Sequence, residues 1–259
     1  MFEKGRLRTY IILFVFLFFF LYVGCGNVTE KESLENTTLE NLTSQNFSKY
    51  LLIPLYFYNL SLWEKVADLN YKGLIIINPN NGPGKNVDPN YQNLIDKLLN
   101  KSKIPIGYVY TKWGTRNITL VESDIDTWLN LYPKIKGFFL DESATSLDKL
   151  SYYETLKNYI KNKGKYIIIL NPGTYPNETY FRVSDVIVVF ENSYQNFNPE
   201  VCLKYPNQSA IIVYNASYED MLSIINSSCK YMYITDNNNL TNPYNTLPSY
   251  FEKEIEYFR

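Results

Sequence analysis

Acidic residues follow two long apolar runs in the chain. The run 138–140 (Phe-Phe-Leu) leads into Asp141 and Glu142, and the run 188–190 (Val-Val-Phe) leads into Glu191. Apolar surroundings raise the pKa of a carboxyl group and a neighbouring carboxylate raises it further, so we expect one of these groups to stay protonated near neutral pH. A protonated carboxyl beside an ionised one can act as the acid and the nucleophile or base of glycoside hydrolysis. These three acids are our candidate catalytic residues, although acids that follow a strand also serve as plain helix caps.

The absence of histidine narrows the chemistry further. With no histidine among its 259 residues, the chain cannot form a Ser-His-Asp triad, a Cys-His pair or a His-ligated zinc site. A metal site made of the three acids is an alternative, but no DxD or EF-hand pattern includes them. We therefore predict neither a metal nor a cofactor.

Further polar and aromatic side chains follow other apolar runs and are candidate substrate-binding residues. Flat tyrosine rings can stack on sugar faces, and asparagine amides can hydrogen-bond sugar hydroxyls. The candidates are Tyr56, Asn78, Tyr108, Tyr110, Arg116, Asn171 and Tyr194. The alternatives are core packing for each tyrosine, a structural turn for each asparagine, and for the arginine either a surface position or a contact that holds the acid pair.

Eight short runs rich in β-branched and aromatic residues alternate with amphipathic segments after residue 50. The runs are 51–58, 73–78, 104–110, 137–141, 166–171, 186–191, 210–214 and 231–235, and helical spacing is clearest at 90–101, 122–131, 147–162, 218–229 and 250–257. Apolar strands separated by helices predict a parallel sheet buried on both faces. Eight such units predict an α/β fold, a (β/α)8 TIM-type barrel with its active site at the carboxyl ends of the strands. An open doubly wound sheet is the alternative, but residues 58–61 lack its Gly-rich phosphate turn.

The N-terminal 25 residues have the pattern of an export signal. Three basic residues within 2–9 precede an uncharged apolar stretch, 10–24, which is typical of a secretory signal and predicts that the rest of the chain leaves the cytoplasm. The stretch is shorter than the ~20 residues that cross a bilayer, so cleavage and retention as an anchor helix both stay open. Cys25 follows Val-Gly as in a lipoprotein processing site, although Tyr22 stands where leucine is usual. We predict a domain on the extracellular side of the cell membrane, held by a single span or a lipid, or else secreted.

Glycosylation sequons give independent support for export. The chain has 12 of them, at Asn27, Asn36, Asn41, Asn46, Asn59, Asn100, Asn117, Asn177, Asn207, Asn215, Asn226 and Asn239. This is roughly three times the number that chance predicts for this composition, and such sequons mark surface positions in secreted proteins.

Composition divides the chain into three parts. Residues 1–25 form the predicted signal or anchor, the polar residues 26–49 read as a disordered, glycosylated stalk, and residues 50–259 suit one barrel domain. Cys202 and Cys229 could pair in an oxidising compartment or remain apart. The net charge of −1 and the lack of a basic block in the sequence argue against nucleic acid as a partner.

Six motifs, read in order, resemble those of the spherulin-4-like proteins. They are Ile53-Pro54-Leu55-Tyr56, residues 76–84 (INPNNGPG preceded by Ile), residues 107–111 with Gly114 and Arg116, residues 137–142 (GFFLDE), Asn171-Pro172-Gly173-Thr174, and Phe190-Glu191. The resemblance covers about residues 51–195. It implies a (β/α)8 barrel, and some members of the family are glycoside hydrolases that cut α-1,4-linked galactosamine-containing polymers with acids that match Asp141, Glu142 and Glu191.

These observations favour an extracellular, membrane-tethered hydrolase of an amino-sugar polysaccharide. A galactosaminidase-like enzyme that cuts within the polymer is the form that the resemblance implies. The alternative is a surface protein that binds glycans or forms part of the cell envelope without cutting anything.

Overall fold

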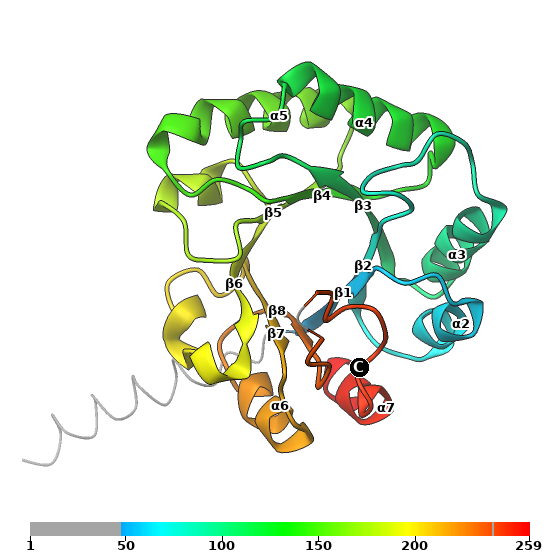
Figure 1. Ribbon diagram of the computed structural model, residues 1–259, viewed down its shortest axis with the longest axis vertical. Helices are drawn as coiled ribbons and strands as arrows, with labels where there is room; N and C mark the ends of the chain where they lie inside the picture. The colour runs from blue at the N-terminus through cyan, green and yellow to red at the C-terminus, as the bar shows by residue number, and fades with distance from the viewer. Residues whose placement is uncertain (1–47, 240) are drawn as a thin grey trace, which may run out of the picture. The chain divides into compact units, whose positions relative to one another are not determined.

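The computed structural model describes residues 48–239 and 241–259, whose strands form one closed parallel barrel (Figure 1). Each strand pairs with the next and the last returns to the first, which confirms the predicted TIM-type fold. The strands are β1 (Tyr50–Leu55), β2 (Gly73–Ile77), β3 (Ile104–Tyr110), β4 (Gly137–Asp141), β5 (Ile167–Asn171), β6 (Val186–Ser193), β7 (Ser209–Tyr214) and β8 (Tyr231–Ile234). The predicted signal or anchor, Cys25 and nearly all of the predicted stalk lie outside the described residues.

The strands are buried because both of their faces are covered. Residues on β1, β2 and β4 are almost wholly inaccessible, with one face toward the barrel interior and the other toward the surrounding helices. On β3 the fit is so close that a Cβ at Gly107 would come within 2.8 Å of the Trp128 ring. The indole of Trp128 in turn donates to the carbonyl of Tyr108 at 2.8 Å, which fixes β3 where it approaches the candidate site.

The helices on the outside begin at side-chain caps that the sequence supplies. They are α2 (Leu60–Asp68), α3 (Pro89–Asn100), α4 (Ile118–Leu131), α5 (Leu150–Lys163), α6 (Tyr218–Ile225) and α7 (Phe251–Glu254), with 3-10 helices η1 (Leu147–Lys149) and η5 (Ile255–Phe258) beside α5 and α7. Asn59, Asp88, Asn117 and Ser217 each accept a backbone N–H in the first turn of α2, α3, α4 and α6. Helix α2 was not among the segments predicted, and α6 ends earlier than its predicted boundary at residue 229.

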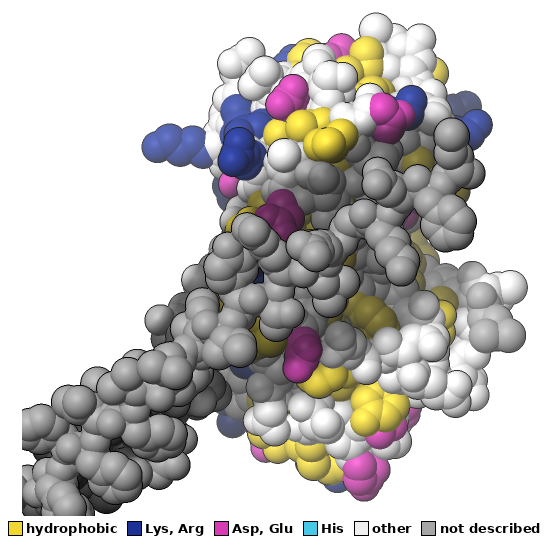
Figure 2. Space-filling model, turned by 90° about the vertical axis from the view of Figure 1, so that its left-hand side faces the viewer, with side chains coloured by type: hydrophobic (Ala, Val, Ile, Leu, Met, Phe, Trp, Pro, Cys, Tyr) yellow, Lys and Arg dark blue, Asp and Glu magenta, His cyan; other side chains and the backbone are white. Residues whose placement is uncertain are grey.

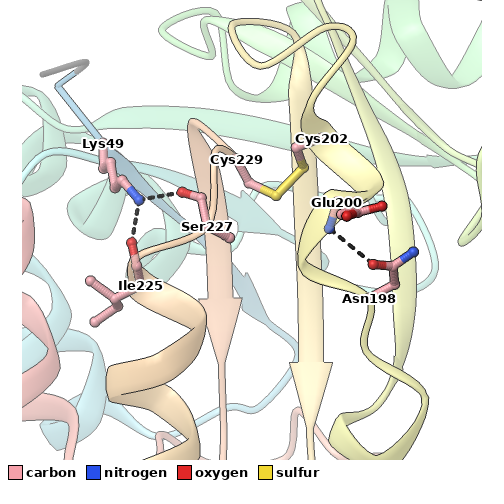
Figure 3. The surroundings of a disulfide bond; sticks show 7 residues. All are labelled: Lys49, Asn198, Glu200, Cys202, Ile225, Ser227 and Cys229. Atoms are coloured by element: carbon pink, nitrogen blue, oxygen red, sulfur yellow. Dashed lines mark hydrogen bonds between the residues drawn. A yellow bond between two sulfur atoms is a disulfide. The ribbon is translucent and has the colours of Figure 1, made fainter. Parts of the chain in front are cut away.

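Between β5 and β7 the connections outside the barrel contain short 3-10 helices in place of α-helices. The connection from β5 to β6 contains the 3-10 helix η2 (Glu178–Arg182), and that from β6 to β7 contains η3 (Tyr194–Asn196) and η4 (Pro199–Cys202). A disulfide from Cys202 to Cys229 ties this second connection to the one that precedes β8 (Figure 3). The pairing that the sequence left open therefore forms, and closing 27 residues of chain contributes roughly 3–4 kcal/mol in the chain-entropy account.

The seam between the first and last strands is short. β1 pairs with β2 over five residues but with β8 only at Tyr50 and Leu51. Beside β8 lies Glu254 of α7, which is fully buried, and neither of its carboxyl oxygens has a hydrogen-bond partner of normal geometry among the described residues. Burial raises the pKa of this carboxyl well above its ordinary value, and the backbone N–H of Ile234 offsets only part of the effect.

The closed barrel, the disulfide and the hydrophobic core all lie within residues 48–259. This part of the chain thus supplies all of its own strand pairings and is a self-contained folding unit. No helix in the described residues is long and apolar enough to span a membrane.

Candidate active site

Three adjacent strands bring the central polar residues to the same end of the barrel. Asp141 is the last residue of β4, Asn171 is the last residue of β5, and Glu191 lies near the end of β6. Asp141 and Asn171 are register partners across the β4–β5 pairing. Because parallel strands of a barrel end on one rim, the asparagine lies between the two acids.

The Asn171 amide bridges the two carboxylates. Its Nδ2 donates to Asp141 Oδ1 at 2.7 Å and to Glu191 Oε2 at 2.6 Å, while its Oδ1 accepts the backbone N–H of Gly173 at 3.1 Å. The last contact fixes the amide orientation with its nitrogen toward the acids. Since the two acid oxygens share one nitrogen, they lie within about 5 Å of each other, a spacing typical of retaining rather than inverting glycosidases.

Tyrosine hydroxyls bind the remaining oxygens of the pair. Tyr108 on β3 donates to Asp141 Oδ2 at 2.7 Å, and Tyr244 donates to Glu191 Oε1 at 2.5 Å. Tyr56, which follows β1, packs edge-on against both rings, with centroids 5.7 Å from Tyr108 and 5.9 Å from Tyr244. Each carboxylate thus accepts two side-chain hydrogen bonds beside an aromatic wall of Tyr56, Tyr108 and Tyr244.

These surroundings act on the pKa values of both acids. Burial raises the pKa of Asp141, but the Tyr108 hydroxyl, the Glu142 backbone N–H and the Asn171 amide all stabilise its ionised form. Burial also raises the pKa of Glu191, and there the charge of Asp141 raises it further against the bonds from Tyr244 and Asn171. Burial thus raises the pKa of both acids, the charge of Asp141 adds to the effect on Glu191, and the two carboxyl groups titrate as a coupled pair.

Glu142, the third predicted acid, lies outside the bridge. Its backbone has φ of +48°, a left-handed conformation that redirects the chain directly after Asp141. Its carbonyl accepts the Thr111 hydroxyl at 2.9 Å and the Trp113 N–H at 2.5 Å, while Oε2 is buried with no partner among the described residues. Burial and the Glu142 carboxyl raise the pKa of Tyr110, so this acid belongs with the end of β3 rather than with Glu191.

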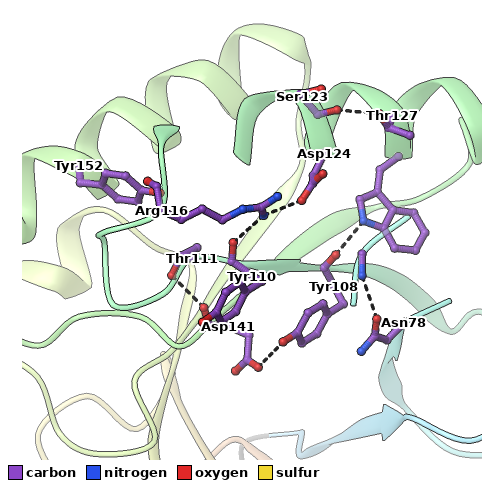
Figure 4. A network of polar contacts seen from close by, with 12 residues as sticks. Asn78, Tyr108, Tyr110, Thr111, Arg116, Ser123, Asp124, Thr127, Asp141 and Tyr152 are labelled. Atoms are coloured by element: carbon purple, nitrogen blue, oxygen red, sulfur yellow. Dashed lines mark hydrogen bonds and ion pairs between the residues drawn. The ribbon is translucent and has the colours of Figure 1, made fainter. Parts of the chain in front are cut away.

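Hydrogen bonds behind the site hold the ends of β3 and β4 together (Figure 4). Thr111 Oγ1 donates to the carbonyl of Asp141 at 2.8 Å and is 3.1 Å from the Tyr153 hydroxyl. Arg116 donates to the carbonyl of Tyr110 at 2.9 Å and to Asp124 on α4 at 2.6 Å. Arg116 therefore braces the loop after β3, and its guanidinium bonds Asp124 instead of the acid pair.

Two other candidate binding residues, Asn78 and Tyr194, take part in the local structure after their strands. Asn78 Oδ1 accepts the N–H of Gly82 at 3.0 Å, which makes its side chain part of the turn after β2. Tyr194 begins η3 directly after β6 and packs partly buried against the core. Both lie at the carboxyl ends of their strands, as predicted.

The sequence reasoning missed Tyr244. It lies on the connection between β8 and α7, which is held by bonds from Asn237 to Asn245 at 2.6 Å and from the Ser249 N–H to Asp236 at 3.1 Å. This connection delivers Tyr244 from β8 to Glu191 on β6. Its length of about 16 residues was a usable signal, because in this fold the connections that follow the strands build the active site.

Across the described ranges, no three or more Asp, Glu or Cys side chains are grouped in a way that could hold a metal ion. Asp141, Glu142 and Glu191, the alternative metal site of the sequence analysis, do not form such a group in the described residues. The two bridged acids are saturated instead by amide and hydroxyl donors.

Comparisons with known proteins agree with this architecture. A model of the spherulation-specific family 4 (Spherulin4) matches residues 50–258. Spherulin-4 of Physarum polycephalum is 36% identical over 226 residues, which cover 79% of this chain and 68% of that protein.

Two solved structures share the fold. The crystal structure of Aspergillus clavatus Sph3 in complex with GalNAc superposes with a TM-score of 0.71 and 23% identity, covering 82% of this chain and 98% of that one. An apo endo-beta-N-acetylglucosaminidase from Cordyceps militaris superposes with a TM-score of 0.55 and 8% identity, covering 86% and 95% of the two chains. The barrel is thus one that also carries glycan-acting enzymes.

Proposed function

Because this chain belongs to the spherulation-specific family 4, and because one amide bridges two partly buried carboxyl groups at its barrel mouth, we propose that it is a glycoside hydrolase. Its substrate in this proposal is an amino-sugar-containing polysaccharide, cut within the chain. The Asn171 bridge carries the proposal, since it holds Asp141 and Glu191 at the spacing that double displacement at a sugar requires.

The surroundings of each acid suggest its role. Glu191, whose pKa is raised by burial and by Asp141, protonates the glycosidic oxygen as the bond to the anomeric carbon breaks. Asp141, ionised and held by Tyr108 and Asn171, attacks that carbon to form a glycosyl ester. Glu191, now ionised, then takes a proton from the water that hydrolyses the ester, and the sugar keeps its anomeric configuration.

The rim also supplies contacts for a sugar. The aromatic wall of Tyr56, Tyr108 and Tyr244 offers apolar ring faces and edges, and the raised pKa values of all three keep their hydroxyls protonated as donors. The Sph3 structure holds GalNAc, which supports a hexosamine as the class of sugar that the present chain binds. Glu142 and Tyr110 lie at the adjacent strand ends and are the side chains that we assign to neighbouring sugar hydroxyl or amino groups.

We place the domain outside the cytoplasm, tethered through its N-terminal segment. The disulfide is of the kind that persists in oxidising compartments. All eight sequon asparagines within the described residues are exposed, as acceptors of glycans must be. Mass loss on enzymatic removal of N-glycans, with detergent-dependent release from membranes, tests this placement; a soluble, unglycosylated native protein would overturn it.

Release of reducing ends from galactosamine-containing polymers tests the hydrolase proposal. The wild type should release them and retain the anomeric configuration in the first product, whereas Glu191→Gln should not. Binding of the same polymers without any cleavage, by both proteins alike, would favour the non-catalytic glycan-binding alternative.

A further inference from the structure

Charge is distributed very unevenly between the two ends of the barrel. The connections that lead into the strands, 48–49, 69–72, 101–103, 132–136, 164–166, 183–185, 203–208 and 226–230, carry nine lysines and one carboxyl side chain, Asp185. We call this end the basic face. The connections that follow the strands, 56–59, 78–88, 111–117, 142–149, 172–177, 194–198, 215–217 and 235–250, carry four basic and four acidic side chains.

Most of the lysines on the basic face have no carboxylate partner among the described residues. Lys134 and Lys204 form exposed ion pairs with Asp96 and Glu178, and Lys103 is buried against backbone carbonyls. The other six are Lys49, Lys72, Lys101, Lys136, Lys165 and Lys230. Lysines near helix C-termini offset helix dipoles, but those that directly precede a strand, such as Lys136 and Lys230, lie beyond the last helical turn.

The basic face is hollow at its centre. A cavity of about 650 Å³ opens among the first residues of β1, β2, β3, β5, β6 and β8. Lys165 and Lys230 line it together with Tyr50, Tyr166 and Tyr231, and so do Asp185 and Lys161, which form an ion pair with each other at 2.8 Å. The Lys230 ammonium lies 5.8 and 5.6 Å from the Tyr50 and Tyr231 ring centroids. Tyrosine rings beside lysines are the side chains that proteins place at the boundary between a bilayer and water.

The chain also enters the barrel at this face. β1 starts at Tyr50, and Lys49 donates to the carbonyls of Ile225 and Ser227 (Figure 3). Lys72 donates to the Ser48 hydroxyl. The chain before Ser48 therefore joins the barrel at the basic face, so a membrane attachment within residues 1–25 would be linked to this face and not to the rim that carries the acids. In the side view of Figure 2, the largest group of Lys and Arg side chains projects from one edge of the molecule, at the upper left.

From these observations we propose that the basic face docks on an anionic lipid surface. Docking turns the rim that carries Asp141 and Glu191 away from the bilayer, toward polymers outside the cell. The inference rests on the proposed membrane placement but not on hydrolysis, so an inactive protein could still dock and an active one could fail to.

Vesicle binding by residues 48–259 tests the proposal without help from the N-terminal segment. The protein should co-sediment with phosphatidylcholine vesicles that contain about one-third phosphatidylglycerol, and not with pure phosphatidylcholine, and binding should weaken in high salt. Replacing Lys136, Lys165 and Lys230 with Gln should weaken binding roughly 100-fold. The matched control replaces Lys85, Lys112 and Lys149 with Gln at the other end, changes the net charge equally and should bind like the wild type.

Three results would overturn the proposal. One is an absence of binding to anionic vesicles, and another is an equal loss in both triple variants, which would show a response to net charge alone. The third is full N-glycan occupancy at Asn100, Asn207 and Asn226 in the native protein, measured by glycopeptide mass spectrometry, because Asn207 and Asn226 lie on the basic face and Asn100 borders it. Glycans at the other five sequons of the described residues are compatible with docking. Thermal melting followed by circular dichroism shows whether each triple variant is still folded, so that weaker vesicle binding can be told from unfolding.

Discussion

Glu191 and Glu254 are two carboxyl groups of one barrel with different surroundings, the first partly buried at the rim and the second fully buried. Burial raises the pKa of both. Glu191 accepts hydrogen bonds from Asn171 and Tyr244 and faces a second acid, whereas the oxygens of Glu254 lack partners of normal geometry among the described residues. A raised pKa therefore identifies a buried acid, but convergent donors and a second acid identify a catalytic one.

The largest expected effect comes from Glu191→Gln. Loss of the general acid should lower kcat by roughly 10²–10⁴-fold in the reducing-end assay. The same substitution should raise the thermal midpoint at neutral pH, because it removes a carboxyl whose ionisation burial and Asp141 oppose. Glu254→Gln is the paired control, and a comparable loss of activity there would erase the distinction between the two acids.

Asn171→Ala should have the next largest effect. It removes one donor from each acid, and hydrogen bonds to charged groups contribute about 1.5–3 kcal/mol, so kcat/KM should fall roughly 10–100-fold. Asn78→Ala is the matched control, because it also loses an asparagine that accepts a backbone N–H in a turn. If the two variants lose activity equally, the bridge adds nothing beyond turn geometry.

Tyr244→Phe should act through the pKa of Glu191. The Tyr244 hydroxyl lowers that pKa by stabilising the carboxylate, so its removal should move the alkaline limb of the kcat/KM profile to higher pH. The fall in kcat should be smaller, about tenfold. Tyr205→Phe removes a hydroxyl bonded to the surface carboxylate Glu178 and should leave the limb in place; an unmoved limb in Tyr244→Phe would exclude a role in tuning Glu191.

Glu254→Gln should change stability alone, and only as the pH rises. In the unfolded chain this carboxyl ionises near its ordinary pKa of 4.5, whereas in the folded barrel it stays protonated to higher pH. The wild type therefore has its full stability below the pKa of the unfolded chain. Its free energy of unfolding is lowered as the pH rises through the pKa of the folded barrel, by about 1.4 kcal/mol for each unit by which folding raises the pKa.

Chemical unfolding of the wild type and Glu254→Gln at about pH 4 and pH 8 measures this difference. The two proteins should be similar at the lower pH, and the variant should be the more stable one at the higher pH. If the difference in unfolding free energy between the two proteins is the same at both pH values, Glu254 is not protonated in the folded barrel.

The barrel and its acidic rim were predictable because they depend on local patterns. Apolar runs of strand length, each ending in a polar residue, predict where Asp141, Asn171 and Glu191 lie without any knowledge of their contacts. The partner of each polar atom depends on distant packing, so the Asn171 bridge, the pairing of Arg116 with Asp124 and the role of Tyr244 did not follow from the sequence. Helix α2 and the 3-10 helices η2, η3 and η4 between β5 and β7 were not predicted, because short segments carry little periodic signal.

The way β1 enters the barrel also determines how the domain resists being pulled. Tension on the residues before Ser48 runs along β1, whose five-residue pairing with β2 lies parallel to that force. Bonds loaded side by side must break together instead of one after another. A domain held by its first strand therefore meets mechanical load in a shearing geometry, and its lifetime under drag depends on how fast β1 slides past β2 rather than on equilibrium stability.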